Sequence, residues 1–134
     1  DVIDLHSNLI SKIENLDHLK CLRMLNLSGN LITCVSNLDS LTSLLELNLR
    51  RNRIKETLGM ENLAKLQRLF LSYNELEQLQ ALLDQLQYCS RLSEITLDGN
   101  PLNKSKHYKT KILKSLAALK QLDMRRITVR YCIV

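Results

Sequence analysis

Histidine and cysteine are the side chains of this sequence best suited to chemistry, because they ligate metals and act as bases or nucleophiles. The three histidines, which are widely separated, are His6, His18 and His107. The four cysteines form no CxxC pair and no zinc-spaced cluster with histidine; they are Cys21, Cys34, Cys89 and Cys132. The sequence also lacks a glycine-rich phosphate loop, a GxSxG motif and an HExxH motif. We therefore expect no enzyme activity, no metal, no cofactor and no disulfide, as in a cytoplasmic protein with reduced thiols.

Positive charge is concentrated near the C-terminal end of the sequence. Residues 1–100 contain 10 Lys/Arg and 13 Asp/Glu, whereas residues 101–134 contain 9 Lys/Arg and one acidic residue, a net charge of +8. This predicted basic cap patch comprises Lys104, Lys106, Lys109, Lys111 and Lys114, with Arg125, Arg126 and Arg130 further along the chain. Such a patch attracts an acidic protein tail or a nucleic acid, unless it is only a solvated helix face. Few aromatic side chains are available there for base stacking, which makes nucleic acid the less favoured partner.

An internal repeat predicts the elements that position these side chains. The 134 residues, of which 45% are hydrophobic, fit one domain, and no run approaches the roughly 18 apolar residues of a membrane span. Leucine fills 31 positions, and the pattern LxxLxLxxNxL recurs with a period of 22 residues and a single step of 26. The asparagines of the five repeats are Asn8, Asn30, Asn52, Asn74 and Asn100. A pattern of this length in register predicts stacked structural units.

Each repeat predicts a short strand, a turn and a return path along the outside of a solenoid. The two leucines of LxL point to the same face of a strand, and stacking of neighbouring repeats buries them behind a parallel concave sheet. The asparagine amide can both donate and accept hydrogen bonds where the chain leaves the strand. Apolar residues at a spacing of three favour 3₁₀-like turns on the convex side. We expect a helix at about residues 79–88, and a less regular wall in the third repeat, where Gly59 is inserted.

The two ends of the sequence predict different structures. Residues 105–120 are expected to form a capping helix, and residues 119–124 a final strand that covers the sheet edge. We therefore predict a single α/β domain with five repeats in residues 1–102, the first truncated, and the capping helix and final strand in residues 103–134. Because the chain starts inside a repeat at Asp1, we expect it to be a fragment of a longer protein.

The 22-residue unit and its Asn-Pro-Leu ending resemble the leucine-rich repeats of the protein phosphatase 1 regulatory class, to which a spliceosomal protein also belongs. Four stretches are more narrowly similar to the leucine-rich-repeat subunit family of the tubulin polyglutamylase complex: NLRRNRI (48–54), LQRLFLSYN (66–74), LSEITLDGNPL (92–102) and LKQLDMRRIT (119–128). In that complex another subunit is the ligase. The resemblance therefore implies a non-catalytic scaffold, partnered by tubulin ligase subunits or tubulin, in the cytoplasm at the cytoskeleton, centriole or cilium.

The concave face is the usual binding face of a solenoid, and strand alternation places the side chains between the inward leucines on it. Phe70, the only phenylalanine, is predicted to lie there outside the core, in a patch of aromatic and arginine side chains typical of interface centres. The alternative interpretation is a solitary surface aromatic. The predicted partner-binding residues are Met24, Asn26, Glu46, Asn48, Arg50, Arg68, Phe70 and Tyr73.

We therefore predict a protein-binding scaffold that takes no small-molecule substrate and does not enter a membrane. Two alternatives remain open on the sequence alone. A nucleic-acid-associated, spliceosomal-like repeat protein would depend on the basic cap patch and bind with a steep salt dependence. A phosphatase regulatory subunit would use acidic and aromatic concave residues over many more than five repeats.

Overall fold

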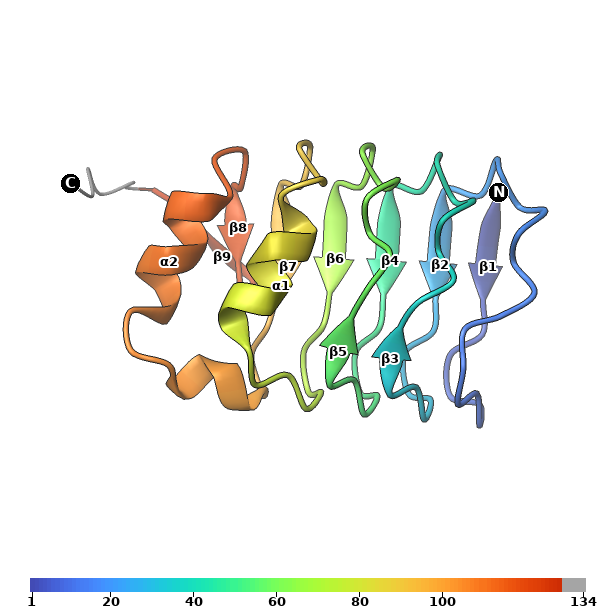
Figure 1. The fold of residues 1–134 in the computed structure, drawn as a ribbon, viewed down its shortest axis with the longest axis horizontal. Helices are drawn as coiled ribbons and strands as arrows, with labels where there is room; N and C mark the ends of the chain where they lie inside the picture. The colour runs from blue at the N-terminus through green and yellow to red at the C-terminus, as the bar shows by residue number, and fades with distance from the viewer. Residues whose placement is uncertain (129–134) are drawn as a thin grey trace.

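Short parallel strands, stacked side by side, form one wall of the molecule (Figure 1). This computed structural model describes residues 1–128. The wall is a seven-stranded sheet in the order β1-β2-β4-β6-β7-β8-β9, in which only the last pair, β8 and β9, is antiparallel. Its strands are β1 (Val2–Asp4), β2 (Met24–Asn26), β4 (Glu46–Asn48), β6 (Arg68–Phe70), β7 (Glu94–Thr96), β8 (Gln121–Leu122) and β9 (Arg125–Arg126). The predicted solenoid with a parallel sheet is confirmed.

The strand register reproduces the repeat of the sequence. Leu25 pairs with Leu47, Leu47 with Leu69, and Leu69 with Ile95, each one repeat further along the chain. These side chains are at most 1% exposed, and they point into the core. Each buried side chain of this size contributes roughly 1.5–3 kcal/mol to stability, and its contacts come from the neighbouring repeats. The repeats therefore stabilise one another.

A ladder of buried asparagines joins consecutive repeats where the chain leaves each strand. Asn52 donates from Nδ2 to the carbonyl oxygens of Leu49 in its own repeat, at 3.1 Å, and Leu27 in the preceding repeat, at 2.9 Å. Its Oδ1 accepts from the amide of Ile32 at 3.0 Å. Asn74 and Asn100 make the equivalent bonds in their own repeats. An amide can meet these demands because it is donor and acceptor at once.

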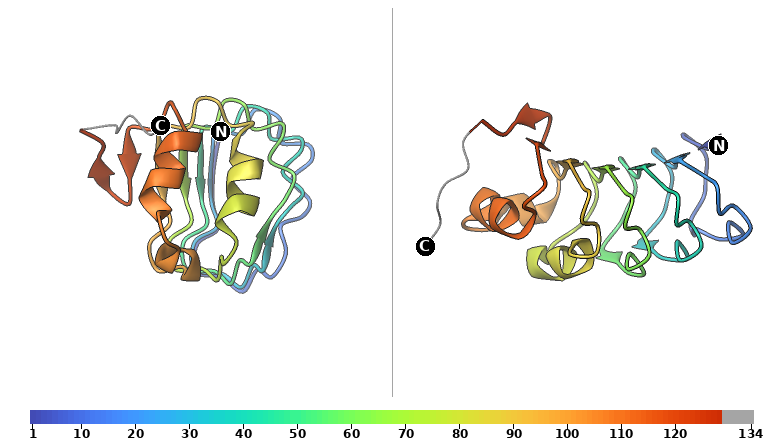
Figure 2. Two further views of the ribbon diagram at one scale, coloured as in Figure 1. Left: turned by 60° about the vertical axis from the view of Figure 1, so that its left-hand side comes forward. Right: turned by 90° about the horizontal axis from the view of Figure 1, so that it is seen from above.

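The convex wall consists of tight turns, one helix and a small sheet (Figure 2). The amide of Leu19 donates to the Leu16 carbonyl at 3.0 Å, and that of Leu41 to the Leu38 carbonyl at 3.0 Å, which are bonds of the 3₁₀ type. The sequence does not predict the parallel pair of β3 (Cys34–Val35) and β5 (Glu56–Thr57). Helix α1 (Leu79–Leu86) lies where the fourth repeat is longer. None of the helices in residues 1–128 is long and apolar enough to cross a membrane.

The expectation that Gly59 disturbs the third repeat is wrong. Gly59 has φ +68°, and Asn37 and Asn15, one and two repeats earlier, have φ +59° and +62°. Gly59 therefore occupies a left-handed position that every convex turn of this kind uses, and asparagine is the residue besides glycine that tolerates it best. A Cβ at Gly59 would meet the Asp39 Oδ1 at 3.0 Å, so glycine also leaves room for that side chain.

The C-terminal cap is shorter and more broken than the predicted helix over 105–120. A 3₁₀ helix, η1 (Pro101–Lys104), precedes α2 (Tyr108–Ser115), and His107 between them has φ +63°, which no α-helix continues. The predicted final strand is also shorter: β8 ends at Leu122 and reverses into β9. The two residues of this hairpin loop, Asp123 and Met124, both have positive φ, 51° and 65°, as a type I′ turn requires.

Asp123 fastens the hairpin to the rest of the solenoid. Its Oδ1 accepts from the amides of Leu97, at 2.6 Å, and Asp98, at 3.1 Å, beyond the end of β7. Its Oδ2 accepts from the Tyr108 hydroxyl of α2 at 3.1 Å. Burial, together with the Asp123 carboxylate, raises the pKa of Tyr108 far above its usual value, so the phenol keeps the proton that it donates. One side chain thus connects the hairpin, the sheet and the capping helix.

Candidate functional site

Two cross-strand rows on the concave sheet carry most of the predicted partner-binding residues. Strand pairing aligns Met24, Glu46, Arg68 and Glu94 in one row. The second row contains Asn26, Asn48, Phe70 and Thr96. In the first row, Arg68 Nε donates to Glu46 Oε1 at 2.9 Å, so both charges already have a partner. Asn26 and Asn48 accept from the backbone two residues further on, so they shape the strand ends. Most polar side chains of these two rows are therefore already hydrogen-bonded within the protein.

Arg50 carries a cation that lacks a carboxylate partner within residues 1–128. Its guanidinium carbon lies 4.2 Å from the centre of the Phe70 ring, and Nη2 donates to Met124 Sδ at 3.7 Å. We call Arg50, Phe70 and Met124 the Arg50 cluster. Stacking on an aromatic ring holds a guanidinium in one place and leaves its other N–H groups free to donate. The cluster therefore presents an oriented cation at the C-terminal half of the concave face.

Phe70 is more deeply buried than the sequence predicts. It lies outside the leucine core, as expected from strand alternation, yet it is only 9% exposed. The Arg50 guanidinium covers one of its faces. A protein approaching the concave face therefore meets Arg50 and Met124 first, and Phe70 acts through the position that it gives to Arg50.

Met124 is a site residue that sequence reasoning missed. It is 65% exposed, and it contacts Arg50 across 74 positions of sequence. Its positive φ is unfavourable for a side chain with a Cβ, and glycine is the usual residue there in a hairpin of this type. A strained, exposed methionine next to an unpaired cation is a sign of a binding surface. No Asn-Gly or similar turn signal marks this loop in the sequence, so Met124 could not be found from it.

Tyr73, which the sequence places with Phe70, belongs to a separate contact. Its own φ is +58°, and Arg51 lies over its ring at 5.0 Å from guanidinium carbon to ring centre. A Cβ on Gly99, which itself has φ +73°, would lie 2.4 Å from the Tyr73 ring, so the ring packs directly on that glycine. Arg51 and Tyr73 therefore line the loops at the ends of the strands, and not the strand rows.

Thr96, next to Phe70 in the second row, is fully buried, and its hydroxyl has no hydrogen-bond partner within residues 1–128. We expect Thr96→Val to raise the free energy of unfolding by about 1 kcal/mol, because a buried polar group without a partner is costly and valine has nearly the same shape. Urea unfolding measures this difference, with Thr42→Val in the exposed turn before β4 as the control. A loss of stability in Thr96→Val would mean that the hydroxyl is bonded in solution.

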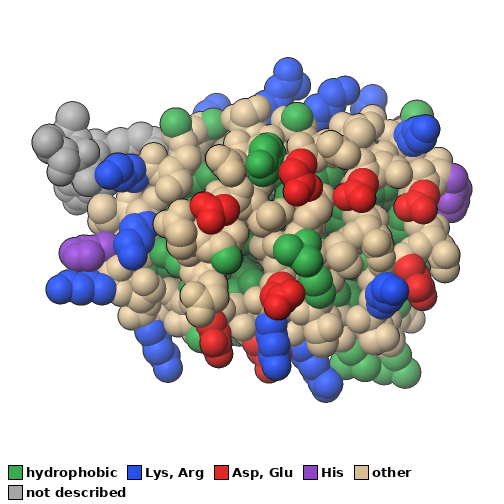
Figure 3. All heavy atoms as spheres, in the orientation of Figure 1, with side chains coloured by type: hydrophobic (Ala, Val, Ile, Leu, Met, Phe, Trp, Pro, Cys, Tyr) green, Lys and Arg blue, Asp and Glu red, His purple; other side chains and the backbone are tan. Residues whose placement is uncertain are grey.

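The structure places the five lysines of the predicted basic cap patch on η1, on α2 and on the residues between them. Lys104 ends η1, Lys106 follows it, and the others lie on α2; all five are exposed. Lys109 and Lys111 are two positions apart and face different directions, whereas Lys111 and Lys114 share a side of the helix. On the face shown in Figure 3, which carries α1 and α2, several basic side chains lie at the cap end, and both acidic and basic ones lie over the repeats. Arg130 lies outside the described residues.

Within residues 1–128, the histidine and cysteine side chains do not gather into a metal site. Within the described part of the chain, no three His, Cys, Asp or Glu side chains are grouped to hold a metal ion. Cys21, Cys34 and Cys89 are free thiols, and Cys132 lies outside the described residues. Burial raises the pKa of the Cys89 thiol to about 11, which keeps it protonated and poorly nucleophilic.

Comparison with known proteins agrees with this geometry. The sequence pattern of the family described as "Leucine-rich repeat" matches residues 4–131. The chain belongs to the leucine-rich-repeat family. Members of this family are typically non-catalytic repeat proteins.

The similar proteins include two curated relatives and several solved structures. Leucine-rich repeat-containing protein 49 of Homo sapiens is 51% identical over 39 residues, which are 29% of this chain and 6% of that protein. The Mus musculus protein of the same name is 51% identical over 37 residues, 28% of this chain and 5% of that protein. The chain thus matches only a small part of these much longer relatives.

Among solved structures, a chain of the Drosophila melanogaster SNF/U2A' complex superposes with a TM-score of 0.86 and 31% identity, covering 95% of this chain and 74% of that chain. A chain of the Chaetomium Mex67:Mtr2 structure gives a TM-score of 0.58 and 32% identity over 67% of this chain and 60% of that chain. A Listeria monocytogenes internalin gives 0.63 at 20% identity, over 90% of this chain and 46% of that chain, and shares the fold.

Proposed function

We propose that this leucine-rich-repeat chain is a non-catalytic scaffold whose concave face binds a protein subunit of a tubulin-modifying complex of the polyglutamylase kind. The observation that carries the proposal is the Arg50 cluster. A cation held between an aromatic ring and a methionine sulfur, without a carboxylate partner in residues 1–128, is prepared for a group on another molecule. Arginine and aromatic side chains are also those most often found at interface centres.

The N-terminal half of the concave face supports the same proposal. A shallow hollow of about 140 Å³ lies there, lined by residues of β1, β2 and β4 that include Met24, Asn26, Glu46 and Asn48. On the same sheet, the Arg50 cluster therefore offers a partner a directed polar contact, and the hollow offers a depression that a side chain can enter. A protein surface fits such an extended, open face better than a small molecule does, because small ligands bind in enclosed pockets.

The class of partner is proposed from sequence similarity. The four stretches similar to the polyglutamylase subunit family, and the 51% identity to Leucine-rich repeat-containing protein 49 over 39 residues, favour tubulin ligase subunits or tubulin as partners. On this proposal the chain acts in the cytoplasm at the cytoskeleton, centriole or cilium. Because the match covers 6% of that relative, the activity and the partners of the whole protein are themselves part of the proposal.

A spliceosomal role is the second candidate. The observation that favours it is the TM-score of 0.86 and 31% identity to a chain of the SNF/U2A' complex over 95% of this chain. In that case the chain would be a nucleic-acid-associated repeat protein, and its binding would depend on the basic cap patch instead of the Arg50 cluster. The two candidates therefore differ in the partner and in the surface that binds it.

Arg50→Glu is expected to lower recovery of the partner at least about tenfold, because a reversed charge repels the group that the oriented guanidinium would bind. The measurement is affinity capture of tagged chain from ciliated-cell lysate, quantified by mass spectrometry. Arg91→Glu is the matched control, because it makes the same change in charge at an exposed residue in the turn after α1. Circular dichroism and thermal unfolding check that both variants fold.

Three outcomes separate the candidates. Recovery of tubulin ligase subunits by the wild type and by Arg91→Glu, with loss in Arg50→Glu, supports the proposal. Recovery of splicing proteins that Arg50→Glu does not lower supports the second candidate and overturns the first. Equal recovery by Arg50→Glu and Arg91→Glu means that the Arg50 cluster does not bind the partner.

A further inference from the structure

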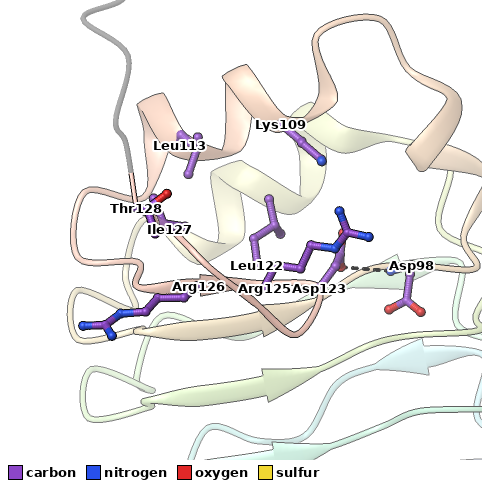
Figure 4. Close-up of a pocket in the computed structure, with 9 residues that line it drawn as sticks. All are labelled: Asp98, Lys109, Leu113, Leu122, Asp123, Arg125, Arg126, Ile127 and Thr128. Atoms are coloured by element: carbon purple, nitrogen blue, oxygen red, sulfur yellow. Dashed lines mark hydrogen bonds between the residues drawn. The ribbon is translucent and has the colours of Figure 1, made fainter.

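A groove of about 580 Å³ lies at the C-terminal end of the solenoid, between α2 and the β8–β9 hairpin (Figure 4). Its lining comes from α2, from the hairpin and the residues that follow it, and from Asp98 in the loop after β7. The partner-binding surface proposed above uses other residues, because the Arg50 cluster does not line this groove. A ligand in the groove would therefore be distinct from a partner on the Arg50 cluster.

One end of the groove is cationic. Lys109 from α2 and Arg125 from β9 extend toward one another there, whereas Arg126 points away from the groove (Figure 4). Both converging side chains are exposed, and neither forms an ion pair within residues 1–128. Two cations that converge from different elements can hold one anion between them, which the separate solvated charges of a helix face do not.

The two acidic residues of the lining do not neutralise these cations. The Asp123 carboxylate accepts hydrogen bonds from the amides of Leu97 and Asp98 and from the Tyr108 hydroxyl. The Asp98 carboxylate accepts from the Ser72 hydroxyl at 2.6 Å. Both carboxylates accept hydrogen bonds from the fold, and neither forms an ion pair with Lys109 or Arg125 within residues 1–128.

The other part of the groove is apolar. Leu113 of α2 and Leu122 of β8 point into the space between the two elements, and Ile127 lies beside them (Figure 4). Leu122 belongs to the hydrophobic core, and Leu113 and Ile127 are partly buried against it, so this part of the lining is held in place by packing. The described lining includes no aromatic ring, so a nucleic-acid base has nothing to stack on.

We propose that this groove binds an acidic peptide, with one carboxylate between Lys109 and Arg125 and a neighbouring apolar side chain against Leu113 and Ile127. The combination of converging cations and an adjacent apolar wall fits a peptide in which an acidic and an apolar group are close together. The carboxylate can belong to a glutamate or aspartate side chain or to a peptide C-terminus, which the experiment distinguishes.

Fluorescence anisotropy with a labelled, C-terminally amidated polyglutamate peptide that contains one central leucine tests the proposal at roughly physiological ionic strength. The double variant Lys109→Glu/Arg125→Glu is expected to weaken binding at least about tenfold. The matched control Lys104→Glu/Lys111→Glu changes the same charge in the same segment outside the groove lining, and is expected to weaken binding less than about threefold. Replacing the peptide leucine by alanine is expected to weaken binding about fivefold.

Each result supports or overturns the proposal. Equal weakening by the two double variants overturns it, because the attraction is then a diffuse effect of net charge. Absence of binding by the amidated peptide, with binding of an apolar peptide that has a free C-terminus, assigns the carboxylate to a chain end. Tighter binding of a single-stranded oligonucleotide with the same dependence on Lys109 and Arg125 overturns the peptide as occupant. Arg50 does not line the groove, and Lys109 and Arg125 do not belong to the Arg50 cluster, so the two proposals are tested by different variants.

Discussion

Asn52→Asp is expected to lower the free energy of unfolding by about 4 kcal/mol. The carboxylate cannot donate, so the carbonyl oxygens of Leu27 and Leu49 lose their buried partner, and each such loss costs about 1–3 kcal/mol. The new negative charge is also placed against both carbonyls at a position only 7% exposed. Equilibrium urea unfolding measures the change.

Asn8→Asp is the matched control, because Asn8 occupies the same repeat position on the exposed edge. It donates to the carbonyls of Leu5 and His6 at 2.9 and 3.1 Å, where water can replace it, so we expect a loss of less than about 1 kcal/mol. If both substitutions cost the same, the asparagine ladder is not a buried hydrogen-bond network. Should Asn52→Asp not fold, Asn52→Ser gives the same comparison with a smaller change.

Asp123→Ala is expected to cost about 3 kcal/mol and to release the C-terminal cap. The amides of Leu97 and Asp98 and the buried Tyr108 hydroxyl all lose their acceptor, and alanine is strained at φ +51°. Urea unfolding measures the free energy, and amide hydrogen exchange at residues 97 and 98 reports the local release. Asp84→Ala is the control, because Asp84 accepts one exposed bond from Gln80 on α1, and we expect a change of less than about 0.5 kcal/mol.

The exchange pattern decides what Asp123 does. Faster exchange confined to the end of β7, α2 and the hairpin indicates that Asp123 fastens the cap. Unchanged exchange at residues 97 and 98 would mean that these two amides do not donate to Asp123 in solution. Because Met124 follows Asp123 in the same loop, release of the hairpin should also weaken partner binding through Arg50, which joins the stability of the cap to the proposed function.

The sequence predicted the repeat architecture well because stacking imposes one pattern on every unit. A leucine column can be buried in only one register, and an asparagine that turns out of a strand must meet the same backbone groups in each repeat. The strand rows, and hence which concave residues lie side by side, follow from the same periodicity. Their pairing did not require the structure.

Features that break or cross the period were not predictable. The pairing of β3 with β5 joins two convex segments whose sequences show no strand alternation. The break at His107 depends on a left-handed residue that carries no turn signal. The mistake at Gly59 came from comparing residue types, because glycine and asparagine look different in sequence although they meet the same conformational demand.

The sequence by itself determined the fold family, the repeat register and the set of side chains on the concave face, because each follows from local periodicity. Only the tertiary structure decided which of them act together. The hairpin folds back so that Met124 reaches Arg50 over 74 positions, Asp123 accepts from the amides beyond β7, and Lys109 and Arg125 line one groove. These contacts join segments with no common repeat, and their geometry depends on packing at the end of the solenoid, where the period stops.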